Sequence, residues 1–182
     1  MAGNLLKRGI FLLYTVSKKI FHPKAYLVSW RDCIKGQCCL STELSSLKGA
    51  KFYFSSLSAS SNVHLVATNG GRLRIGKGCF FNRNGIVVAR NEITIGEGCL
   101  FGPNVCIYDH NHGFGANAKV DDYKLGSVVI GKNVWIGAQC VILSNTVIGD
   151  NCVIGAGCVV KGNIPANSLV TMSRELNVCP LR

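Results

Sequence analysis

Aliphatic and aromatic residues recur at every sixth position over much of the chain. The longest run consists of Ile130, Ile136, Ile142, Ile148, Ile154 and Val160, and two earlier runs consist of Ile75, Phe81, Val87 and of Ile95, Phe101, Ile107. An α-helix would repeat every 3.6 residues, and a meander would alternate strands with turn pairs. A period of six instead predicts an all-β solenoid, in which each coil has three short parallel strands joined by tight corners.

A second position of the same repeat carries small or β-branched residues. These stand four positions after the anchors, at Cys79, Cys99, Val134, Cys140, Thr146, Cys152 and Cys158. Alternate side chains of a strand share a face, so the small residue two positions before an anchor points inward with it. Five of the ten cysteines lie in this slot and are predicted to be small buried hydrophobes. The corner glycines Gly76, Gly96, Gly131, Gly137 and Gly155 are expected to supply the backbone freedom of sharp turns.

The repeat is interrupted between Ile107 and Val129 by the segment YDHNHGFGANAKVDDYKLGS. This segment predicts a protruding loop over residues 109–128, and loops on rigid scaffolds often carry function. The alternative is a surface excursion with incidental histidines.

The first fifty residues do not follow the repeat. Residues 4–21 have an apolar middle between Lys7, Arg8 and Lys18, Lys19, which predicts a helix that Pro23 closes. This helix either caps the open end of the solenoid or packs in a trimer, or it lies on an anionic membrane surface. The predicted divisions are an N-terminal helical segment 1–55, a β-helix 56–166 and a tail 167–182.

The net charge of +11 favours anionic partners, and residues 1–50 contribute +6 of it through eight Lys or Arg and two Asp or Glu. Nucleic-acid binding is not predicted, because the chain has no recognisable motif and no aromatics interleaved with its basic residues. There is no signal peptide with a cleavage site, and the apolar run 10–16 is shorter than the roughly 20 residues that span a bilayer. We therefore expect a cytoplasmic protein, with membrane association only through the N-terminal helix.

The register over residues 60–166 resembles the hexapeptide-repeat family of left-handed β-helices. The blocks CLFGPNVCIYDHNHGF and VVIGKNVWIGAQCVI resemble the maltose, galactoside and polysaccharide O-acetyltransferase branch of that family. The resemblance implies an acetyl-CoA-dependent acetyltransferase that acts on a sugar or nucleotide-sugar hydroxyl. It also implies a homotrimer whose sites lie between protomers.

The same match places the catalytic histidine of this branch on His112. Its phase agrees, because His112 lies five positions after Ile107, as Trp135 lies five after Ile130, and this phase points outward. In the family the imidazole is a general base that takes the proton of the attacking hydroxyl. Cys106 is interpreted as a packing residue because this chemistry needs no covalent nucleophile.

Further roles are implied by the resemblance alone. Trp135 would contact the thioester end of CoA, the amides of Ala138 and Ala156 would bind pantetheine, and Lys161 would contact a CoA phosphate. The Ala138 amide would also donate to the developing oxyanion.

On the acceptor side the resemblance implies a sugar-binding role for Asn82, and Asn84 lies nearby. Asp109 and His110 would orient His112 or contact the acceptor. The chain departs from the family pattern at two places. Gly113 stands where proline is usual, and the segment TMSREL stands where the family has an arginine-bearing tail, so that Arg174 is the candidate substitute for that arginine.

Two other functions stay open: N-acetylation of an amino sugar, and a non-catalytic scaffold subunit. A metal site is not predicted. The β-helical carbonic anhydrases bind zinc through histidines that include a pair five residues apart, and His22, His64, His110 and His112 contain no such pair.

Overall fold

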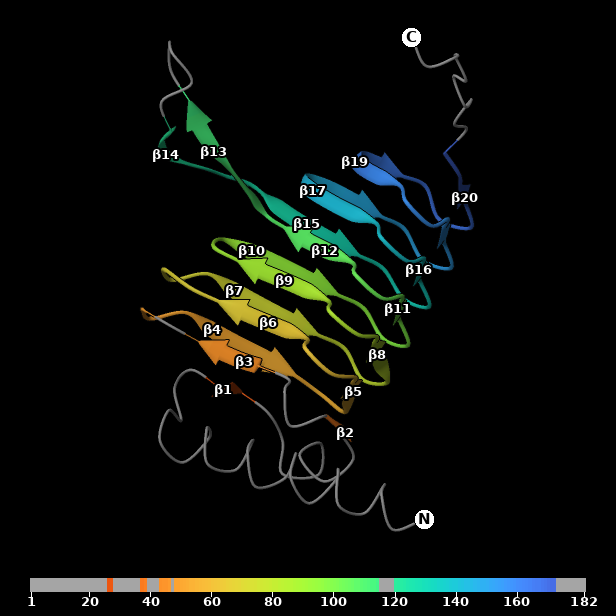
Figure 1. Ribbon diagram of the computed structural model, residues 1–182, viewed down its shortest axis with the longest axis horizontal. Helices are drawn as coiled ribbons and strands as arrows, with labels where there is room; N and C mark the ends of the chain where they lie inside the picture. The colour runs from red at the N-terminus through yellow and green to blue at the C-terminus, as the bar shows by residue number, and fades with distance from the viewer. Residues whose placement is uncertain (1–25, 28–36, 39–42, 47, 115–119, 173–182) are drawn as a thin grey trace, which may run out of the picture.

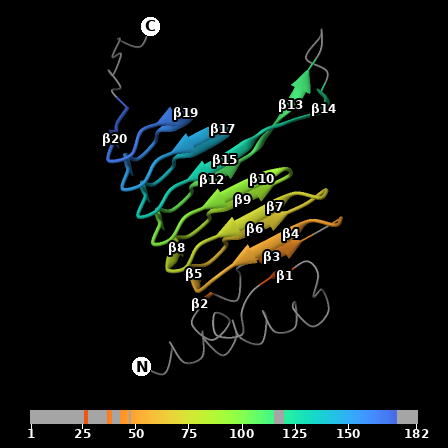
Figure 2. The same cartoon turned by 180° about the vertical axis from the view of Figure 1, so that it is seen from behind.

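The computed structural model describes residues 26–27, 37–38, 43–46, 48–114 and 120–172. These residues form a parallel β-solenoid of stacked three-sided coils with one hairpin projecting from an edge (Figures 1 and 2). The predicted all-β solenoid is therefore confirmed. The predicted helix 4–21 and most of the tail lie outside the described residues. Within the described part of the chain, no helix is long and apolar enough to cross a membrane.

Each coil contributes one strand to each of three faces. The first face consists of β1 (Tyr26–Leu27), β4 (Lys51–Phe54), β7 (Arg72–Ile75), β10 (Glu92–Ile95) and β15 (Ser127–Ile130). The second face consists of β2 (Gln37–Cys38), β5 (Leu57–Ala59), β8 (Cys79–Phe81), β11 (Leu100–Phe101), β16 (Trp135–Ile136), β18 (Val153–Ile154) and β20 (Leu169–Val170).

The third face consists of β3 (Glu43–Ser46), β6 (His64–Ala67), β9 (Ile86–Ala89) and β12 (Cys106–Tyr108), followed by the first residues of β17 (Val141–Ile148) and β19 (Val159–Ile164). Strand β17 continues around the corner, pairing with β12 at its start and with β15 at its end. The first and third faces are thereby joined in one 11-stranded sheet. The paired strands extend beyond the predicted bounds 56–166 at both ends.

Like side chains stack on like in the core. In the second face, Phe81 pairs with Phe101, whose neighbour on the other side is Ile136, and the two phenyl rings are parallel with centroids 4.4 Å apart. Every predicted anchor is at most 4% exposed, and so is every residue of the predicted small slot. The six-residue pattern therefore predicted the core correctly, including the five buried cysteines.

The corners differ from the expectation that glycine supplies their backbone freedom. Positive φ angles occur at asparagines, including Asn84 (59°), Asn104 (58°), Asn133 (54°) and Asn151 (57°), and at other glycines such as Gly78 and Gly98, but at none of the five predicted corner glycines. Asparagine tolerates this region, and its side chains form ladders, with Asn84 Nδ2 donating to Asn104 Oδ1 at 3.1 Å.

The predicted corner glycines are needed for a different reason, the close approach of successive coils. A Cβ added to Gly76 would lie 2.7 Å from the backbone of the next coil, and a Cβ added to Gly96 would lie 2.5 Å from the carbonyl oxygen of Gly131. A side chain at these positions would push neighbouring coils apart. The predicted role of these glycines was wrong, although their position at the corners was right.

The predicted loop 109–128 is a β-hairpin. Its strands β13 (His110–Phe114) and β14 (Val120–Leu125) pair antiparallel, with His112 opposite Tyr123. The hairpin leaves the solenoid where β12 ends. In both views it lies at the opposite edge of the molecule from β8 and β20 (Figures 1 and 2).

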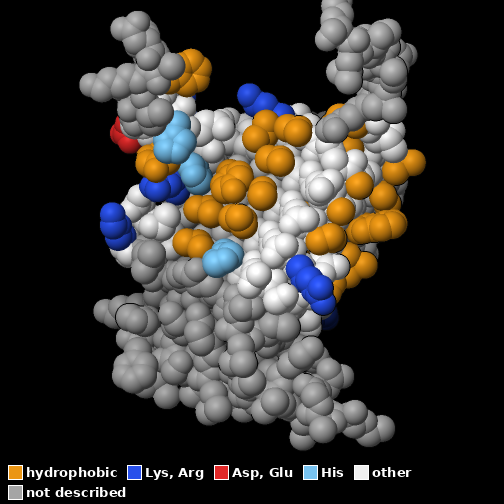
Figure 3. All heavy atoms as spheres, in the orientation of Figure 1, with side chains coloured by type: hydrophobic (Ala, Val, Ile, Leu, Met, Phe, Trp, Pro, Cys, Tyr) orange, Lys and Arg blue, Asp and Glu red, His pale blue; other side chains and the backbone are white. Residues whose placement is uncertain are grey.

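The outward side of the third face is apolar. Ile86, Cys106, Val141 and Val159 pair in sequence along the solenoid axis, and Val159 is 57% exposed. Hydrophobic side chains gather over β9, β12 and β17 on this face (Figure 3).

Candidate active site

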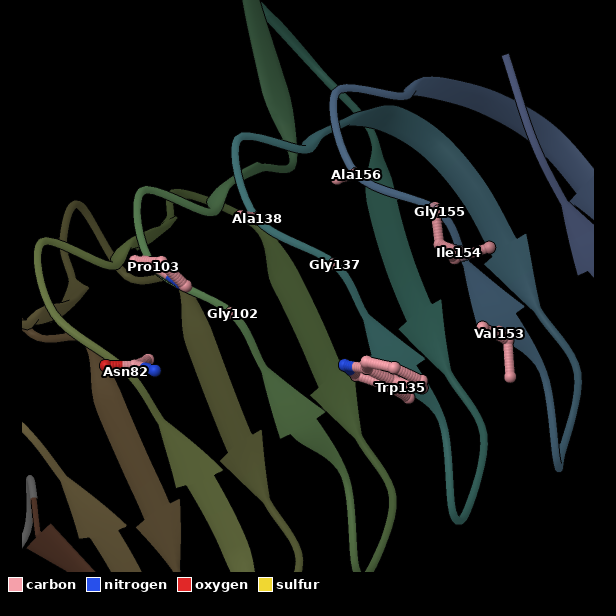
Figure 4. Close-up of a pocket in the computed structure, with 10 residues that line it drawn as sticks. All are labelled: Asn82, Gly102, Pro103, Trp135, Gly137, Ala138, Val153, Ile154, Gly155 and Ala156. Atoms are coloured by element: carbon pink, nitrogen blue, oxygen red, sulfur yellow. The ribbon is translucent and has the colours of Figure 1, made fainter.

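A cavity of about 490 Å³ lies at the edge where the second face turns toward the third (Figure 4). Its wall comes from four successive coils and is built largely of backbone and small side chains. The lining residues are Asn82, Gly102, Pro103, Trp135, Gly137, Ala138, Val153, Ile154, Gly155 and Ala156. Four residues predicted from the sequence, namely Asn82, Trp135, Ala138 and Ala156, therefore share one cavity.

Two backbone amides in this wall are unused. Neither the Ala138 nor the Ala156 N–H donates a hydrogen bond within the described residues, although the neighbouring amides of Gly137 and Gly155 do. Gly102 and Gly137 keep both amides uncovered, because a Cβ on either glycine would lie 2.7 Å from the nitrogen of Ala138 or Ala156, respectively. Sequence analysis did not assign a site role to Gly102 or Gly137. The cavity thus offers two donors on successive coils to an elongated ligand with carbonyl groups.

Trp135 and Asn82 supply the hydrogen-bonding side chains of the cavity. Trp135 points outward as predicted and is 56% exposed; in Figure 4 it lies between Asn82 and Val153. Asn82 Oδ1 accepts the amide of Arg83 at 2.8 Å, and its Nδ2 has no partner among the described residues. Asn84 lies instead in the asparagine ladder at the corner and does not line the cavity.

Asp109 fixes the base of the hairpin. Its side chain is fully buried, and its carboxylate accepts the amides of Arg90 at 3.0 Å and Asn91 at 2.7 Å. The same carboxylate lies 2.9 Å from His110 Nδ1, while its backbone carbonyl accepts Gly126 N and Ser144 Oγ. The Asp109 carboxylate therefore orients the His110 ring. The expectation from the sequence was that Asp109 orients His112 or contacts the acceptor.

Tyr123 connects the two histidines of the hairpin. Its ring centroid lies 4.5 Å from that of His112 and 5.4 Å from that of His110, and the guanidinium carbon of Arg90 lies 3.6 Å from it. His112 is exposed, whereas the His110 side chain is only 11% exposed. Sequence reasoning missed Tyr123 and Arg90, because neither belongs to a motif and only the hairpin pairing brings them together.

The two groups of predicted site residues do not meet within one chain. The cavity lies where the second face ends, near Pro103, and the hairpin begins only after Asp109 (Figures 1 and 4). Residues 103–104 form a turn and strand β12 (Cys106–Tyr108) follows, so the hairpin starts at the far end of this strand from the cavity, and no hairpin residue lines the cavity. Lys161 is exposed on β19 and lines neither the cavity nor the cluster around Tyr123.

The pKa shifts of the core thiols differ in direction. Burial raises the pKa of Cys140. The interaction between the Cys79 and Cys99 thiols raises the pKa of Cys79 and lowers that of Cys99. Cys106 is half-buried on the apolar third face. Within the described ranges, no three His, Cys, Asp or Glu side chains are grouped so that they could hold a metal ion.

Comparison with known proteins matches residues 127–162 to the family described as bacterial transferase hexapeptide (six repeats). This match confirms the resemblance to hexapeptide-repeat proteins for that segment. No curated protein sequence matches the chain.

Several solved structures share the fold. A variant of AntD, an N-acyltransferase from Bacillus cereus, in complex with dTDP-4-amino-4,6-dideoxyglucose and coenzyme A, is 17% identical, with a TM-score of 0.64 over 84% of this chain and 82% of that one. A maltose O-acetyltransferase from Clostridium difficile 630 is 23% identical, with a TM-score of 0.51 over 89% and 81%. A hexapeptide-repeat acetyltransferase from Vibrio cholerae in complex with acetyl coenzyme A is 21% identical, with a TM-score of 0.54 over 90% and 79%. At these identities the likeness establishes the fold.

Proposed function

We propose that this protein is an acyltransferase that moves the acetyl group of acetyl-CoA to a sugar hydroxyl. The observation that carries the proposal is the cavity walled by backbone, with the unpartnered amides of Ala138 and Ala156 beside the exposed Trp135. The pantetheine arm of CoA is an elongated chain with two amide carbonyls, and its shape and acceptors suit such a wall. Solved structures of the same fold that bind CoA or acetyl-CoA give further support.

The chemistry then follows from the exposed imidazole of His112. His112 takes the proton of the acceptor hydroxyl as the oxygen attacks the thioester carbonyl carbon. The developing oxyanion accepts a hydrogen bond from the Ala138 amide. Collapse of the tetrahedral intermediate breaks the C–S bond, and the CoA thiolate leaves and recovers the proton. No side chain forms a covalent intermediate.

We assign the base role to His112 and a supporting role to His110. His110 is held by Asp109 and lies with its ring against Tyr108 and Tyr123, which leaves little room for an acceptor. His112 is exposed and has no hydrogen bond to another described residue. Its imidazole is therefore accessible to a substrate hydroxyl.

The proposal includes a homotrimer in which each site is shared between copies. The acyl-CoA cavity and His112 lie at opposite edges of the third face, so one copy would supply Trp135 and its neighbour would supply His112. The apolar third face between them, with Val159 57% exposed, is a suitable surface for packing copies together. Lys161 would act as a point charge toward a CoA phosphate only in such an assembly.

The acceptor is proposed to be a sugar or nucleotide sugar, bound in part by the free Nδ2 of Asn82. O-acetylation is the first hypothesis, and N-acetylation of an amino sugar is the alternative. The solved structures of the same fold include both a maltose O-acetyltransferase and an N-acyltransferase bound to a nucleotide amino sugar. Turnover with hydroxyl acceptors and with amino-sugar acceptors distinguishes the two reactions.

The test is acetyl-CoA turnover, measured as release of free thiol over a panel of sugars, amino sugars and nucleotide sugars. Replacing His112 with Ala should lower kcat by about 10²–10⁴-fold, the range expected for loss of a general base. Asn111→Ala, an exposed neighbour on the same strand, is the matched control and should retain activity. His110→Ala tests the competing assignment.

A larger loss in His110→Ala than in His112→Ala would transfer the base role to His110. Absence of turnover with every acceptor, together with absence of CoA binding in calorimetry, would favour the scaffold alternative.

A further inference from the structure

A second cavity, of about 210 Å³, lies between the hairpin and the solenoid. Its wall is formed by Asn69 and Arg90, which follow β6 and β9 at the same corner of successive coils, and by Asp122, Tyr123 and Leu125 of β14. It is separate from the larger cavity that contains Trp135. It adjoins the cluster of Tyr123 with His110 and His112.

Arg90 brings an uncompensated positive charge to this cavity. Its Nε is buried and has no hydrogen-bond partner, and no ion pair joins its guanidinium to an acid among the described residues. A buried donor without a partner costs free energy that a ligand acceptor would recover.

Arg74 provides an internal comparison. Its guanidinium carbon lies 4.0 Å from the centroid of the Tyr53 ring, much as that of Arg90 lies 3.6 Å from Tyr123. Arg74 Nε, however, lies 3.7 Å from Glu92 Oε1. Among the described residues, the arginine–tyrosine stack of Arg74 thus has a carboxylate beside it, and that of Arg90 under the hairpin has none.

The described acidic side chains near Arg90 are engaged in other contacts or exposed to solvent. The carboxylate of Asp109 accepts two backbone amides and contacts His110. Asp122 lines the cavity, but its side chain is exposed to solvent, and its Oδ1 accepts the amide of Tyr123 at 2.7 Å. Solvent screens an exposed charge more strongly than a buried one, so the buried Nε of Arg90 leaves the interior of the cavity attractive to an anion.

We propose that this cavity binds an oxyanion, a carboxylate or phosphate group carried by the acceptor sugar, and that Arg90 determines this specificity. The inference rests on the proposed acetyl transfer and names its substrate class. A cavity of about 210 Å³ is smaller than the roughly 300–1,000 Å³ of whole-ligand sites, so it suits one charged group. Because Tyr123 contacts both Arg90 and His112, an anion held there leaves the sugar ring extending toward His112. The planar guanidinium matches either oxyanion through paired hydrogen bonds.

The experiment compares glucose, glucose 1-phosphate and glucuronate as acceptors for the full-length wild type, Arg90→Gln, Arg90→Lys and the control Arg74→Gln. The wild type should have a lower KM for a charged acceptor than for glucose, and the preferred charged sugar distinguishes phosphate from carboxylate. Arg90→Gln should raise that KM by about 10–100-fold, the range for losing a hydrogen bond to a charged group. It should leave the KM for acetyl-CoA and for glucose unchanged. Arg90→Lys should restore part of the loss, and Arg74→Gln should behave as wild type.

Three results would overturn the assignment: equal KM values for charged and neutral acceptors in the wild type, an equal effect of Arg90→Gln on both, or the same effect in Arg74→Gln. An equal effect on both acceptors would mean that Arg90 only packs the hairpin. If the wild type turns over none of these sugars, calorimetric binding of glucose 1-phosphate and glucuronate decides separately. Binding that Arg90→Gln weakens would support the anion site although the proposed reaction had failed, and no binding would reject the site.

Discussion

At the scale of single residues, Asp109 links the solenoid to the hairpin. It occupies an inward position after β12, where the repeat would place an apolar side chain, and is fully buried. Its carboxylate is stabilised by amides from the coil beneath and by His110, and its carbonyl binds Gly126 and Ser144. A charge can be buried only when it is satisfied in this way. Asp109 therefore sets the direction in which the hairpin histidines leave the solenoid.

Replacing Asp109 with Asn tests this role. The amide keeps the size of the side chain but loses charge-assisted hydrogen bonds from the amides of Arg90 and Asn91. We expect a loss of unfolding free energy of roughly 2–4 kcal/mol, since each hydrogen bond to a charged group contributes about 1.5–3 kcal/mol. Urea unfolding measures it, with exposed Asp122→Asn as the control, expected to change stability by less than about 0.5 kcal/mol. Equal effects of the two substitutions would contradict the anchoring role of Asp109.

Sequence patterns predicted single residues well where the repeat fixes their phase. The outward position of Trp135 and the inward positions of the five cysteines follow directly from counting in sixes, whereas His112 lies on the hairpin, where the repeat no longer applies. The hydrogen bonds of the Asp109 carboxylate to the amides of Arg90 and Asn91 could not be predicted in this way, because they join segments far apart in the sequence. Arg90 was missed for the same reason: it follows β9 at an ordinary corner, and its significance comes from Tyr123 more than thirty residues later.

At the scale of elements, the corner between the second and third faces determines the larger cavity. Successive coils approach so closely there that glycine is required at Gly102 and Gly137, and the same absence of Cβ atoms leaves the Ala138 and Ala156 amides open. The sequence predicted that glycines lie at the corners, but it did not predict that the close approach of successive coils requires them. The left-handed backbone is supplied instead by the asparagines of the ladders and by other glycines, such as Gly78 and Gly98. The requirement for coil packing and the proposed requirement for ligand binding thus fall on the same residues.

A pair of glycine substitutions separates close packing from ordinary corner geometry. In Gly102→Ala, the new Cβ would lie 2.7 Å from Ala138 N and 2.9 Å from the Gly137 carbonyl carbon. Both atoms belong to the backbone, so the coils must shift. We expect a stability loss of about 1–3 kcal/mol and weaker CoA binding in calorimetry. Gly85→Ala is the control, because its nearest atom would be 3.5 Å away, and it should change neither quantity appreciably. Wild-type CoA affinity in folded Gly102→Ala would argue against pantetheine binding at this corner.

At the scale of the whole molecule, the third face separates the cavity beside Trp135 from the hairpin that carries His112. The strand β12 leads from the corner beside the cavity to the base of the hairpin, and no bend in the described chain brings these edges together. The sequence placed His112 and Trp135 in one functional set because the family resemblance links them. Their distance could not be predicted from the hexad phase, which fixes inside and outside but not the edge of a face. The proposed assembly of copies through the apolar third face would bring the His112 of one copy to the Trp135 of its neighbour.

Mixing two inactive variants tests this shared site. If His112 and Trp135 act within one chain, a mixture of His112→Ala and Trp135→Ala should be as inactive as its parts. If neighbouring copies supply them, random exchange of subunits in a closed ring leaves about one quarter of the interfaces with both residues intact. Activity should then rise toward about a quarter of the wild-type value after the variants are unfolded together and refolded. It should not rise when separately refolded trimers are mixed for a time too short for exchange.

Val159→Asp provides the complementary measurement. A charge at this exposed apolar position should dissociate the assembly, as measured by sedimentation, and abolish turnover. A monomeric Val159→Asp variant with full activity would show that one chain holds the complete site.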